Sequence, residues 1–436
     1  MFSYLSRGFL GFLVVVALLV SSGVAQAVTY YVDPFIGQDY FNGTSMSANY
    51  GNNTGPWRTL DRLQGTPLRG GDKVLFRKGS VFTTGLIINR DGNQNGASNS
   101  SPVTFGAYGD SGYGPVFEKG NNIYDWAHAI DVKGRYIVIE GIEARKTHEA
   151  GIYLWSDAHH VKIRGCKITD VGIAIYLDSS SDNEIYNNLI VSLHLVESSG
   201  NNDFGANGVW LNNSCSNNVI RDNTFSKCRA TSLEFGTDGG ALEIYSTRDD
   251  SVCNNNVFTR NRIDEGNGVV EIGAGPGGRD GLVSNLSITY NVCYKNGYFN
   301  VFHTEGGVRD FENIYVDHNT VVEPNFVFQS GTPVIGFDPG FPGYEYTTWT
   351  NNIFYIGRDF RFLSQNFQAV FWDNTFHLEN PGFTLYNLNP STNGNNTGNP
   401  LFQYYDPTKS FESQNFRLRS PSPASGRGAY APGGLQ

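Results

Sequence analysis

Charged residues are scarce in this sequence. They make up 17% of its 436 residues, whereas soluble domains average about 25%. Long charged helices and coiled coils are therefore excluded, because they need many Glu, Lys and Arg residues. Positive charge is the rarer sign: the formal net charge is −10, which argues against a nucleic-acid-binding protein, since such proteins carry a basic face. The negative net charge disfavours a polyanionic substrate only weakly, because a protein with this net charge can still have a local basic cleft.

Long apolar runs are missing except near the start of the chain. The run 9–20 follows Arg7 and precedes Ala25-Gln26-Ala27, which is the order of a secretion signal with its small-residue cleavage site. It has about a dozen residues, short of the ~20 that a membrane-spanning helix needs. We therefore expect residues 1–27 to be a cleaved signal peptide and the mature chain to be secreted or periplasmic, with an uncleaved anchor as the alternative.

Cysteine is also sparse, and no two cysteines form a CxxC pair. A zinc or redox motif is therefore disfavoured, and we expect buried thiols, with one disulfide as the alternative. HExxH, EF-hand, P-loop and dinucleotide motifs are missing as well. We expect no required cofactor and assign no metal ligand. A Ca²⁺ site built from Asp and Asn oxygens is compatible with the composition but has no diagnostic spacing.

Glycine and aromatic residues, by contrast, are abundant, with 52 Gly, 30 Phe and 24 Tyr, and they favour strands and turns. Short segments that end in an Asn-centred turn recur along the chain. Their equivalent positions are Cys166, Asn188, Asn223, Asn261, Asn291, Asn319, Asn352 and Asn374. The shortest spacing, 22 residues, sets the length of one coil, and the surplus elsewhere indicates insertions at about 191–207, 228–240 and 322–333. Asn tolerates the left-handed turn conformation and its amide can bond the Asn above and below. The repeat predicts an all-β fold, a right-handed parallel β-helix (solenoid) with an Asn ladder and long loops flanking one sheet.

A second family of segments precedes each new coil, with apolar residues alternating with outward ones at the period of a strand. The first outward positions are Tyr153, Tyr176, Trp210, Glu243 and Glu271, and the second are Trp155, Asp178, Asn212, Tyr245 and Gly273. Because neighbouring coils lie about 4.8 Å apart, we expect each set to form a column on one long sheet, with the insertions walling a groove beside it.

The two ends of the chain carry a family resemblance. The N-terminal segments are Tyr31-Val32-Asp33-Pro34, 55–60 and 68–76, and the C-terminal ones are Asn399-Pro400-Leu401-Phe402, 415–418 and 420–424. They resemble the capping and closing segments of the pectate-lyase-like right-handed β-helix superfamily of carbohydrate-active proteins, over roughly residues 29–428. The resemblance is specific for fold and loose for chemistry, since the superfamily holds lyases, hydrolases, epimerases and non-enzymes. It implies one domain over residues 28–436, with a cap region at 28–102, main coils at 103–390 and a closing segment at 391–436.

Glu243 and Glu271 are the leading catalytic candidates. In the expected register they stack as adjacent carboxylates, which disfavours their joint ionisation. A separation of about 5–5.5 Å suits a retaining glycosidase with one acid and one nucleophile. Asp238, in the Gly-rich turn before Glu243, is a candidate catalytic acid or a partner of Glu243, or an ordinary turn residue. His303 is a candidate general base or sugar hydrogen-bonder, with a structural histidine as the alternative.

The substrate-binding candidates are Tyr153, Tyr176, Trp210, Tyr245 and Asp203. The first three run directly into the two glutamates and would offer ring faces to a sugar. The alternative is that they stabilise the sheet by stacking on one another. Asp203 precedes the strand of Trp210, and its alternative is again a turn-forming role.

Three functions compete for this sequence. The leading one is a secreted glycoside hydrolase acting on a polysaccharide or oligosaccharide. The alternative is a polysaccharide lyase or C5-epimerase acting on an alginate- or pectin-like uronate polymer, with His303 and Tyr245 as base and acid. That chemistry needs a cation to neutralise a carboxylate, and the outward columns contain no Lys or Arg. The third function is that of a non-catalytic binding protein. The expected stacking of Glu243 on Glu271 counts against it, because like charges directly opposite each other destabilise a sheet. We expect no nucleic-acid partner, no membrane association after signal cleavage, and a monomer.

Overall fold

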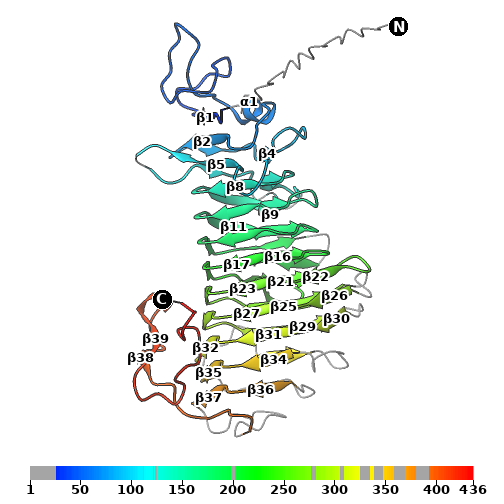
Figure 1. Cartoon of the computed structure of the whole chain (residues 1–436), viewed down its shortest axis with the longest axis vertical. Helices are drawn as coiled ribbons and strands as arrows, with labels where there is room; N and C mark the ends of the chain where they lie inside the picture. Colours follow the sequence, from blue (N-terminus) through cyan, green and yellow to red (C-terminus); the bar gives the residue numbers. More distant parts are fainter. Residues whose placement is uncertain are drawn as a thin grey trace, which may run out of the picture.

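The computed structural model describes residues 26–435, except 111, 121, 123–124, 198–201, 276–280, 305–308, 325–333, 338–346, 358–368 and 380–391. Its strands form coils that stack along one axis (Figure 1). Each strand of a coil pairs in parallel with its counterpart in the next coil. The predicted all-β solenoid, a parallel β-helix, is therefore confirmed. Helical structure in the described residues is limited to α1 (Leu60–Gln64) and the 3-10 turn η2 (Phe411–Ser413).

Three sheets run along the coils. The first sheet contains β1 (Thr29–Val32), β2 (Lys73–Arg77), β5 (Val103–Tyr108), β8 (Ile137–Glu140), β10 (Lys162–Arg164), β12 (Glu184–Tyr186), β17 (Val219–Arg221), β23 (Val257–Thr259), β27 (Ser287–Thr289), β31 (Ile314–Asp317), β34 (Thr347–Thr350) and β36 (Val370–Trp372). The second, which we call the site sheet, contains β4 (Leu86–Ile88), β7 (His128–Val132), β9 (Glu143–Leu154), β11 (Lys167–Asp178), β16 (Asn207–Asn212), β21 (Gly240–Tyr245), β25 (Gly268–Ala274), β29 (Tyr298–Thr304) and β33 (Ile335–Phe337).

The third sheet contains β3 (Val81–Phe82), β6 (Val116–Phe117), β13 (Leu189–Val191), β18 (Thr224–Ser226), β24 (Arg262–Asp264), β28 (Val292–Tyr294), β32 (Thr320–Glu323), β35 (Ile353–Ile356) and β37 (Thr375–Leu378). The long strands β9 and β11 belong to both the site sheet and the third sheet. The first half of each strand pairs with strands of the third sheet, and the second half pairs with strands of the site sheet. The corner between these two sheets falls at Lys146 in β9 and at Asp170 in β11, which both have positive φ angles.

Aliphatic side chains fill the interior of the coils. On the site sheet the inward column consists of Ile152, Ile175, Val209, Leu242 and Val270, all fully buried. From this column onward, inward and outward residues alternate along the strands, as the period-two pattern predicted. Burial of such a side chain contributes roughly 1.5–3 kcal/mol, so the stacked columns hold each coil to its neighbours.

The Asn ladder joins the first sheet to the third and is confirmed. Each Asn from Asn188 to Asn352 donates its backbone N–H and its side-chain amide to the Oδ1 of the next, at 2.8–3.1 Å. The ladder extends one step beyond the prediction, from Asn374 to Asn395. The left-handed turn conformation, however, falls on the residue before each ladder position, such as Arg260 or Tyr290. The amide hydrogen bonds, rather than a tolerance for that conformation, therefore explain why Asn stands at these positions.

Two hairpins rise beside the site sheet at two of the predicted insertions. β14 (Leu195–Glu197) pairs with β15 (Asp203–Gly205), and β19 (Ala230–Ser232) pairs with β20 (Gly236–Asp238). The third predicted insertion, at 322–333, lies mostly outside the described residues. A small further sheet is formed by β22 (Val252–Asn254), β26 (Gly281–Ser284) and β30 (Arg309–Glu312). Each of the two hairpins leads directly into a strand of the site sheet.

The C-terminal segment runs back along the side of the lower coils (Figure 1). It contains the antiparallel pair β38 (Phe402–Tyr404) and β39 (Asn415–Leu418). Phe402 and Phe416 pack there against outward residues of the third sheet, including Tyr294 and Tyr355. The domain boundaries stay a prediction, and most of the predicted signal lies outside the described residues.

All five cysteines, Cys166, Cys215, Cys228, Cys253 and Cys293, are buried thiols. This outcome matches the first of the two sequence alternatives. Burial raises the pKa of the Cys166 thiol to about 12, so this thiol is in its unreactive form near neutral pH. Among the described residues, no helix has the length and apolar character needed to cross a bilayer.

Candidate active site

One outward column of the site sheet brings the leading candidates together. Tyr153, Tyr176, Trp210, Glu243 and Glu271 lie opposite one another on successive strands. The predicted register is therefore confirmed. The column also begins one strand earlier than predicted, with Asp131 opposite Tyr153. Acidic residues thus stand at both ends of an aromatic stack.

Glu271 is held by a tyrosine that the sequence reading missed. The hydroxyl of Tyr298 donates a hydrogen bond to Oε2 of Glu271. Tyr298 is paired with Gly268 of the preceding coil, and its ring lies over that glycine so closely that a Cβ there would overlap the ring. Burial raises the pKa of Tyr298 well above its usual value, and the charges of Glu271, Asp238 and Glu243 add to the effect. Tyr298 therefore stays a protonated donor, and three carboxylates lie within electrostatic reach of its hydroxyl.

Glu243 is held in a comparable way by Asn207, whose side-chain amide donates to its Oε2. Asn207, Gly240, Gly268 and Tyr298 occupy one column beside the glutamates. Asp238 ends β20, immediately before the strand of Glu243, and its Oδ1 accepts the Gly239 N–H at 2.7 Å. Its position beside the pair agrees with the prediction, while its hydrogen bond is of the kind that turn-forming aspartates make.

The aromatic stack differs from the predicted sugar platform. The Tyr176 and Trp210 rings are nearly parallel, with centroids 5.1 Å apart, and Tyr153 lies 4.5 Å from Tyr176. Phe204, from β15, covers Trp210 edge-on at 5.3 Å. The three column rings are only 7–8% exposed, so their faces are occupied by one another. The alternative role, stacking that stabilises the sheet, fits this arrangement. Contact of their edges with a substrate stays a prediction.

Asp203 does not face a substrate in this structure. It is 5% exposed, and both its oxygens accept hydrogen bonds from the turn of the other hairpin. Ser232 donates its hydroxyl at 2.7 Å and Leu233 donates its N–H at 2.7 Å. The predicted substrate contact is therefore corrected: Asp203 links the β14–β15 hairpin to the β19–β20 hairpin, because a buried carboxylate must have its hydrogen bonds satisfied.

The second outward column forms a polar network beside the aromatic stack. Asp178 accepts a hydrogen bond from the Tyr153 hydroxyl at 3.3 Å and one from Asn213 at 3.0 Å, and it forms an ion pair with Arg248 at 3.5 Å. Asn212 donates to the Tyr176 hydroxyl at 2.8 Å. Tyr245 follows Asn212 in register, as predicted, and it lies edge-on to Trp210 at 6.0 Å.

His303 pairs with Gly273 through the backbone. It therefore continues the second column, one strand beyond Glu271. Its side chain lies outside the described residues, so its role stays a prediction.

The N-terminal end of the face carries a charged cluster. His128 Nδ1 lies 2.8 Å from Asp131 Oδ1, and its Nε2 lies 3.0 Å from Glu149 Oε2. Burial opposes protonation of the ring, but the two carboxylates outweigh it and raise the pKa of His128 to about 9. The same contact holds the pKa of Asp131 below its usual value despite burial. His128 is therefore an imidazolium clamped between two carboxylates at neutral pH.

Comparison with known proteins identifies the fold family. Residues 84–336, which include every site residue described above, match the family model described as "Right handed beta helix region". The chain belongs to the right-handed β-helix family. No curated protein is similar to the sequence at a significant level.

Solved structures of β-helix proteins resemble this chain. A rhamnogalacturonan lyase is 14% identical with a TM-score of 0.53, over 80% of this chain and 87% of that one. The GH136 lacto-N-biosidase from Eubacterium ramulus is 13% identical with a TM-score of 0.50, over 82% of this chain and 67% of that one. The pectate lyase Pel9A is 12% identical with a TM-score of 0.48, over 92% and 91%. At such identities the likeness shows the fold, and it agrees with the expected pectate-lyase-like superfamily.

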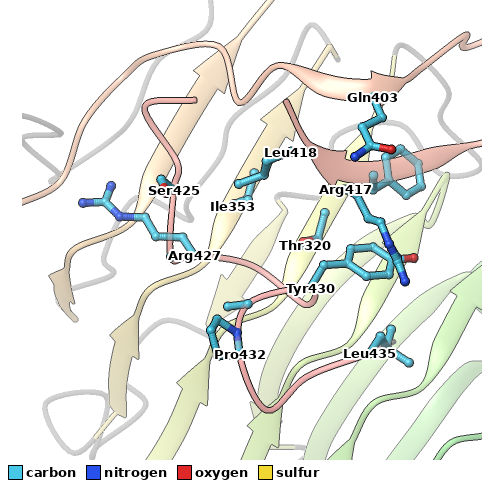
Figure 2. Close-up of a pocket in the computed structure, with 13 residues that line it drawn as sticks. Thr320, Ile353, Gln403, Arg417, Leu418, Ser425, Arg427, Tyr430, Pro432 and Leu435 are labelled. Atoms are coloured by element: carbon cyan, nitrogen blue, oxygen red, sulfur yellow. The ribbon is translucent and has the colours of Figure 1, made fainter. Parts of the chain in front are cut away.

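A separate cavity of this β-helix lies away from the glutamates. It measures about 400 Å³ and is bounded by the C-terminal segment, with Arg417, Arg427 and Tyr430, and by Thr320 and Ile353 of the third sheet (Figure 2). The Arg417 guanidinium lies 4.7 Å from the centre of the Tyr430 ring. This cavity therefore lies between a part of the C-terminal segment and the coils, and it shares no residue with the candidate active site.

No group of three or more His, Cys, Asp or Glu side chains in the described part of this β-helix is arranged to hold a metal ion. The composition-based Ca²⁺ site stays a prediction.

Tyr298 and Asn207 were missed for a physical reason. The sequence reading assumed strict alternation, but Val269 and Val270 both face the core, so alternation breaks just before Glu271. Gly268 therefore precedes Glu271 by three residues, whereas strict alternation would place the neighbouring outward residue two positions before it. The usable signal was the repeat of small or polar residues three positions before Trp210, Glu243 and Glu271.

Proposed function

We propose that this protein is an exported carbohydrate-active enzyme, a glycoside hydrolase that cleaves a polysaccharide or oligosaccharide at Glu243 and Glu271. The observation that carries the proposal is the pairing of these two residues, Glu243 opposite Glu271, on the outward face of adjacent strands. Adjacent strands lie about 4.8 Å apart, close to the separation of about 5–5.5 Å that retaining glycosidases use. A retaining reaction is therefore proposed.

The hydrogen bonds assign a role to each glutamate. The Tyr298 hydroxyl is a donor to Glu271, which favours the ionised form of that carboxylate and suits a nucleophile. Glu243 accepts from a neutral amide, a contact that a protonated carboxyl also makes through its carbonyl oxygen. In the proposed reaction Glu243 donates its proton to the leaving oxygen while Glu271 attacks the anomeric carbon. Glu243 then deprotonates the water that releases the sugar from Glu271.

The names of the structural neighbours are compatible with two chemistries. The lacto-N-biosidase is a hydrolase by its name, and the rhamnogalacturonan lyase is a lyase. Arg248 is the observation that favours the second candidate, a polysaccharide lyase or C5-epimerase. Its exposed guanidinium beside Asp178 is a cation that can face the carboxylate of a uronate. The hydrolase is preferred because Glu243, Glu271 and Asp238 gather at the other end of the stack, where a uronate would meet like charge.

The test is a product assay on neutral and uronate polysaccharides with the full chain. Hydrolysis produces reducing ends without the ultraviolet absorbance of an unsaturated product, and we expect Glu243→Gln and Glu271→Gln each to lower kcat by at least about a hundredfold, or about 2.7 kcal/mol. The matched control is Glu140→Gln, an outward acid of the first sheet. Full activity in both active-site variants, or absorbance in step with reducing ends, would reject the hydrolase. Export, a monomeric state and independence from a cofactor stay predictions of the sequence.

A further inference from the structure

The charged cluster at the N-terminal end of the face has features that the proposed chemistry does not use. Asp131 accepts hydrogen bonds at its Oδ1 from His128 and from the Trp155 indole, at 2.8 and 2.7 Å. Glu149 is bound to His128 through its Oε2. Asp131 Oδ2 and Glu149 Oε1 accept no hydrogen bond from the described part of the chain. Two positioned carboxylate oxygens are thus available to a ligand.

An exposed indole stands beside these oxygens. Trp155 is 36% exposed, in contrast to the buried rings of the aromatic stack. Tyr153 packs on it at 4.7 Å, and the ammonium of Lys133 lies 4.8 Å from the centre of its ring. A lysine side chain moves easily, so the flat apolar face of a sugar ring can take the place of that ammonium. An aromatic face beside a few fixed polar groups is a typical composition of a small-molecule site, and here it suits a sugar ring, which has both hydroxyl donors and an apolar face.

We propose that Asp131, Glu149 and Trp155 form a binding subsite for an uncharged sugar ring of the substrate. This inference rests on the proposed function and names the substrate class: a neutral oligosaccharide or polysaccharide. Hydroxyl groups of the sugar donate to the open oxygens of Asp131 and Glu149, and its apolar face stacks on Trp155. The role of His128 is to position both carboxylates, because its two ring nitrogens hold one oxygen of each.

The register fixes how far the subsite lies from the reacting pair. Asp131 and Glu243 belong to the same column, four strand steps apart, which is about 19 Å at the usual strand spacing. A disaccharide cannot reach from one to the other, whereas a hexasaccharide can. The subsite therefore predicts an enzyme that prefers long substrates.

Charge selects against a uronate at this end. The open hydrogen-bonding atoms are carboxylate oxygens, which attract hydroxyl donors and repel a sugar carboxylate. Of the cations nearby, His128 is clamped by two carboxylates and Arg248 pairs with Asp178. Lys133 lies over the Trp155 ring and helps to lower the pKa of Asp131, so its charge is offset by that carboxylate. We expect neutral sugars to bind better than oligogalacturonides.

The experiment measures binding by calorimetry in the full chain carrying Glu271→Gln, so that ligands stay intact. The probes are neutral gluco-, manno-, xylo- and galacto-hexasaccharides, with hexagalacturonide as the charged probe. In that background we expect Trp155→Ala to lower the affinity for the best neutral ligand about tenfold, or about 1.4 kcal/mol. We expect Asp131→Asn to lower this affinity as well. Trp155→Phe, which keeps an aromatic ring, should restore most of the affinity. The matched control is Trp372→Ala, which removes a tryptophan that is 46% exposed on the first sheet.

Kinetics separate this inference from the proposed function. With Glu271 intact, Trp155→Ala should raise KM for the hexasaccharide more than KM for a disaccharide, which is too short to reach from Glu243 to the subsite. Hydrolysis that shows no such dependence on length would leave the hydrolase standing and overturn the subsite. If the protein hydrolyses no substrate but binds a neutral hexasaccharide in a way that depends on Trp155, the hydrolase is rejected and the subsite stands. Absence of binding to every neutral hexasaccharide, or stronger binding of hexagalacturonide, also overturns the subsite.

Discussion

Replacing Gly268 by alanine tests the geometry of the active site with a single methyl group. A Cβ at Gly268 would lie closer than 3.0 Å to Cζ, Cε2 and the hydroxyl of Tyr298, a separation that real Cβ atoms essentially never show. The end of the ring would have to move by roughly 1 Å, which costs about 1–3 kcal/mol in a packed site. Such a movement breaks the hydrogen bond to Glu271, and hydrogen bonds to charged groups contribute about 1.5–3 kcal/mol. We expect kcat to fall by about ten- to a hundredfold.

Gly240→Ala is the matched control for this prediction. Gly240 occupies the same column one coil earlier, and the nearest atom to its added Cβ is the Gly268 carbonyl oxygen at 3.4 Å, an ordinary contact. Neither glycine has a positive φ, so the backbone tolerates alanine at both, and Gly240→Ala should be neutral or slightly stabilising. The assays are kcat on the best substrate from the product screen and the free energy of unfolding in urea. Equal activity and stability in the two variants would refute the reasoning.

Three further predictions address the rest of the structure. Because the folded-state pKa of His128, about 9, lies above its unfolded value of about 6.5, its stabilisation is fully present below about pH 6.5 and is lost as the pH rises through about 9. Urea unfolding across that range should therefore show a loss of about 2–3 kcal/mol in the wild type that His128→Asn lacks. Asn291→Ala leaves the buried N–H of Asn261 without its acceptor and should lower the free energy of unfolding by about 2–4 kcal/mol, measured by urea titration. Asp203→Ala should speed hydrogen exchange at the Leu233 amide at least about tenfold, and unchanged exchange would contradict the proposed link between the hairpins.

Much of the fold was predictable because similar short segments recur in successive coils. A ladder amide must recur once in every coil, so the Asn positions marked the coils. The aligned strand segments 242–245 and 270–273 then predicted the pairing of Glu243 with Glu271. A second ladder, Asn183–Asn218–Asn256, was missed although it repeats five residues before the first. It covers only three coils, and a pattern that short does not stand out in a sequence rich in Asn.

The candidate site was predictable only in part, because side-chain direction depends on contacts that spacing does not encode. The column containing Trp210 was correct, yet nothing in the spacing shows that Phe204 covers that ring. The carboxylate of Asp203 looked like a site residue since it precedes a site strand, whereas the partner that binds it comes from a hairpin about thirty residues later. His128 was overlooked because its two acceptors lie on different strands.

The Asn ladder has a direction, and that direction makes the two ends of the solenoid unequal. Each Asn of the ladder donates its backbone N–H and one side-chain N–H to the coil that follows it. Its other side-chain N–H donates to a backbone carbonyl of the coil before it, and its Oδ1 accepts from that coil. At a ladder position, cutting the chain after a coil would strand two donors, whereas cutting before a coil would strand one donor and the Oδ1 acceptor. Proteins tolerate an unsatisfied carbonyl oxygen more readily than an orphaned N–H. Along the ladder, the C-terminal end of the solenoid therefore has one more donor to satisfy than the N-terminal end.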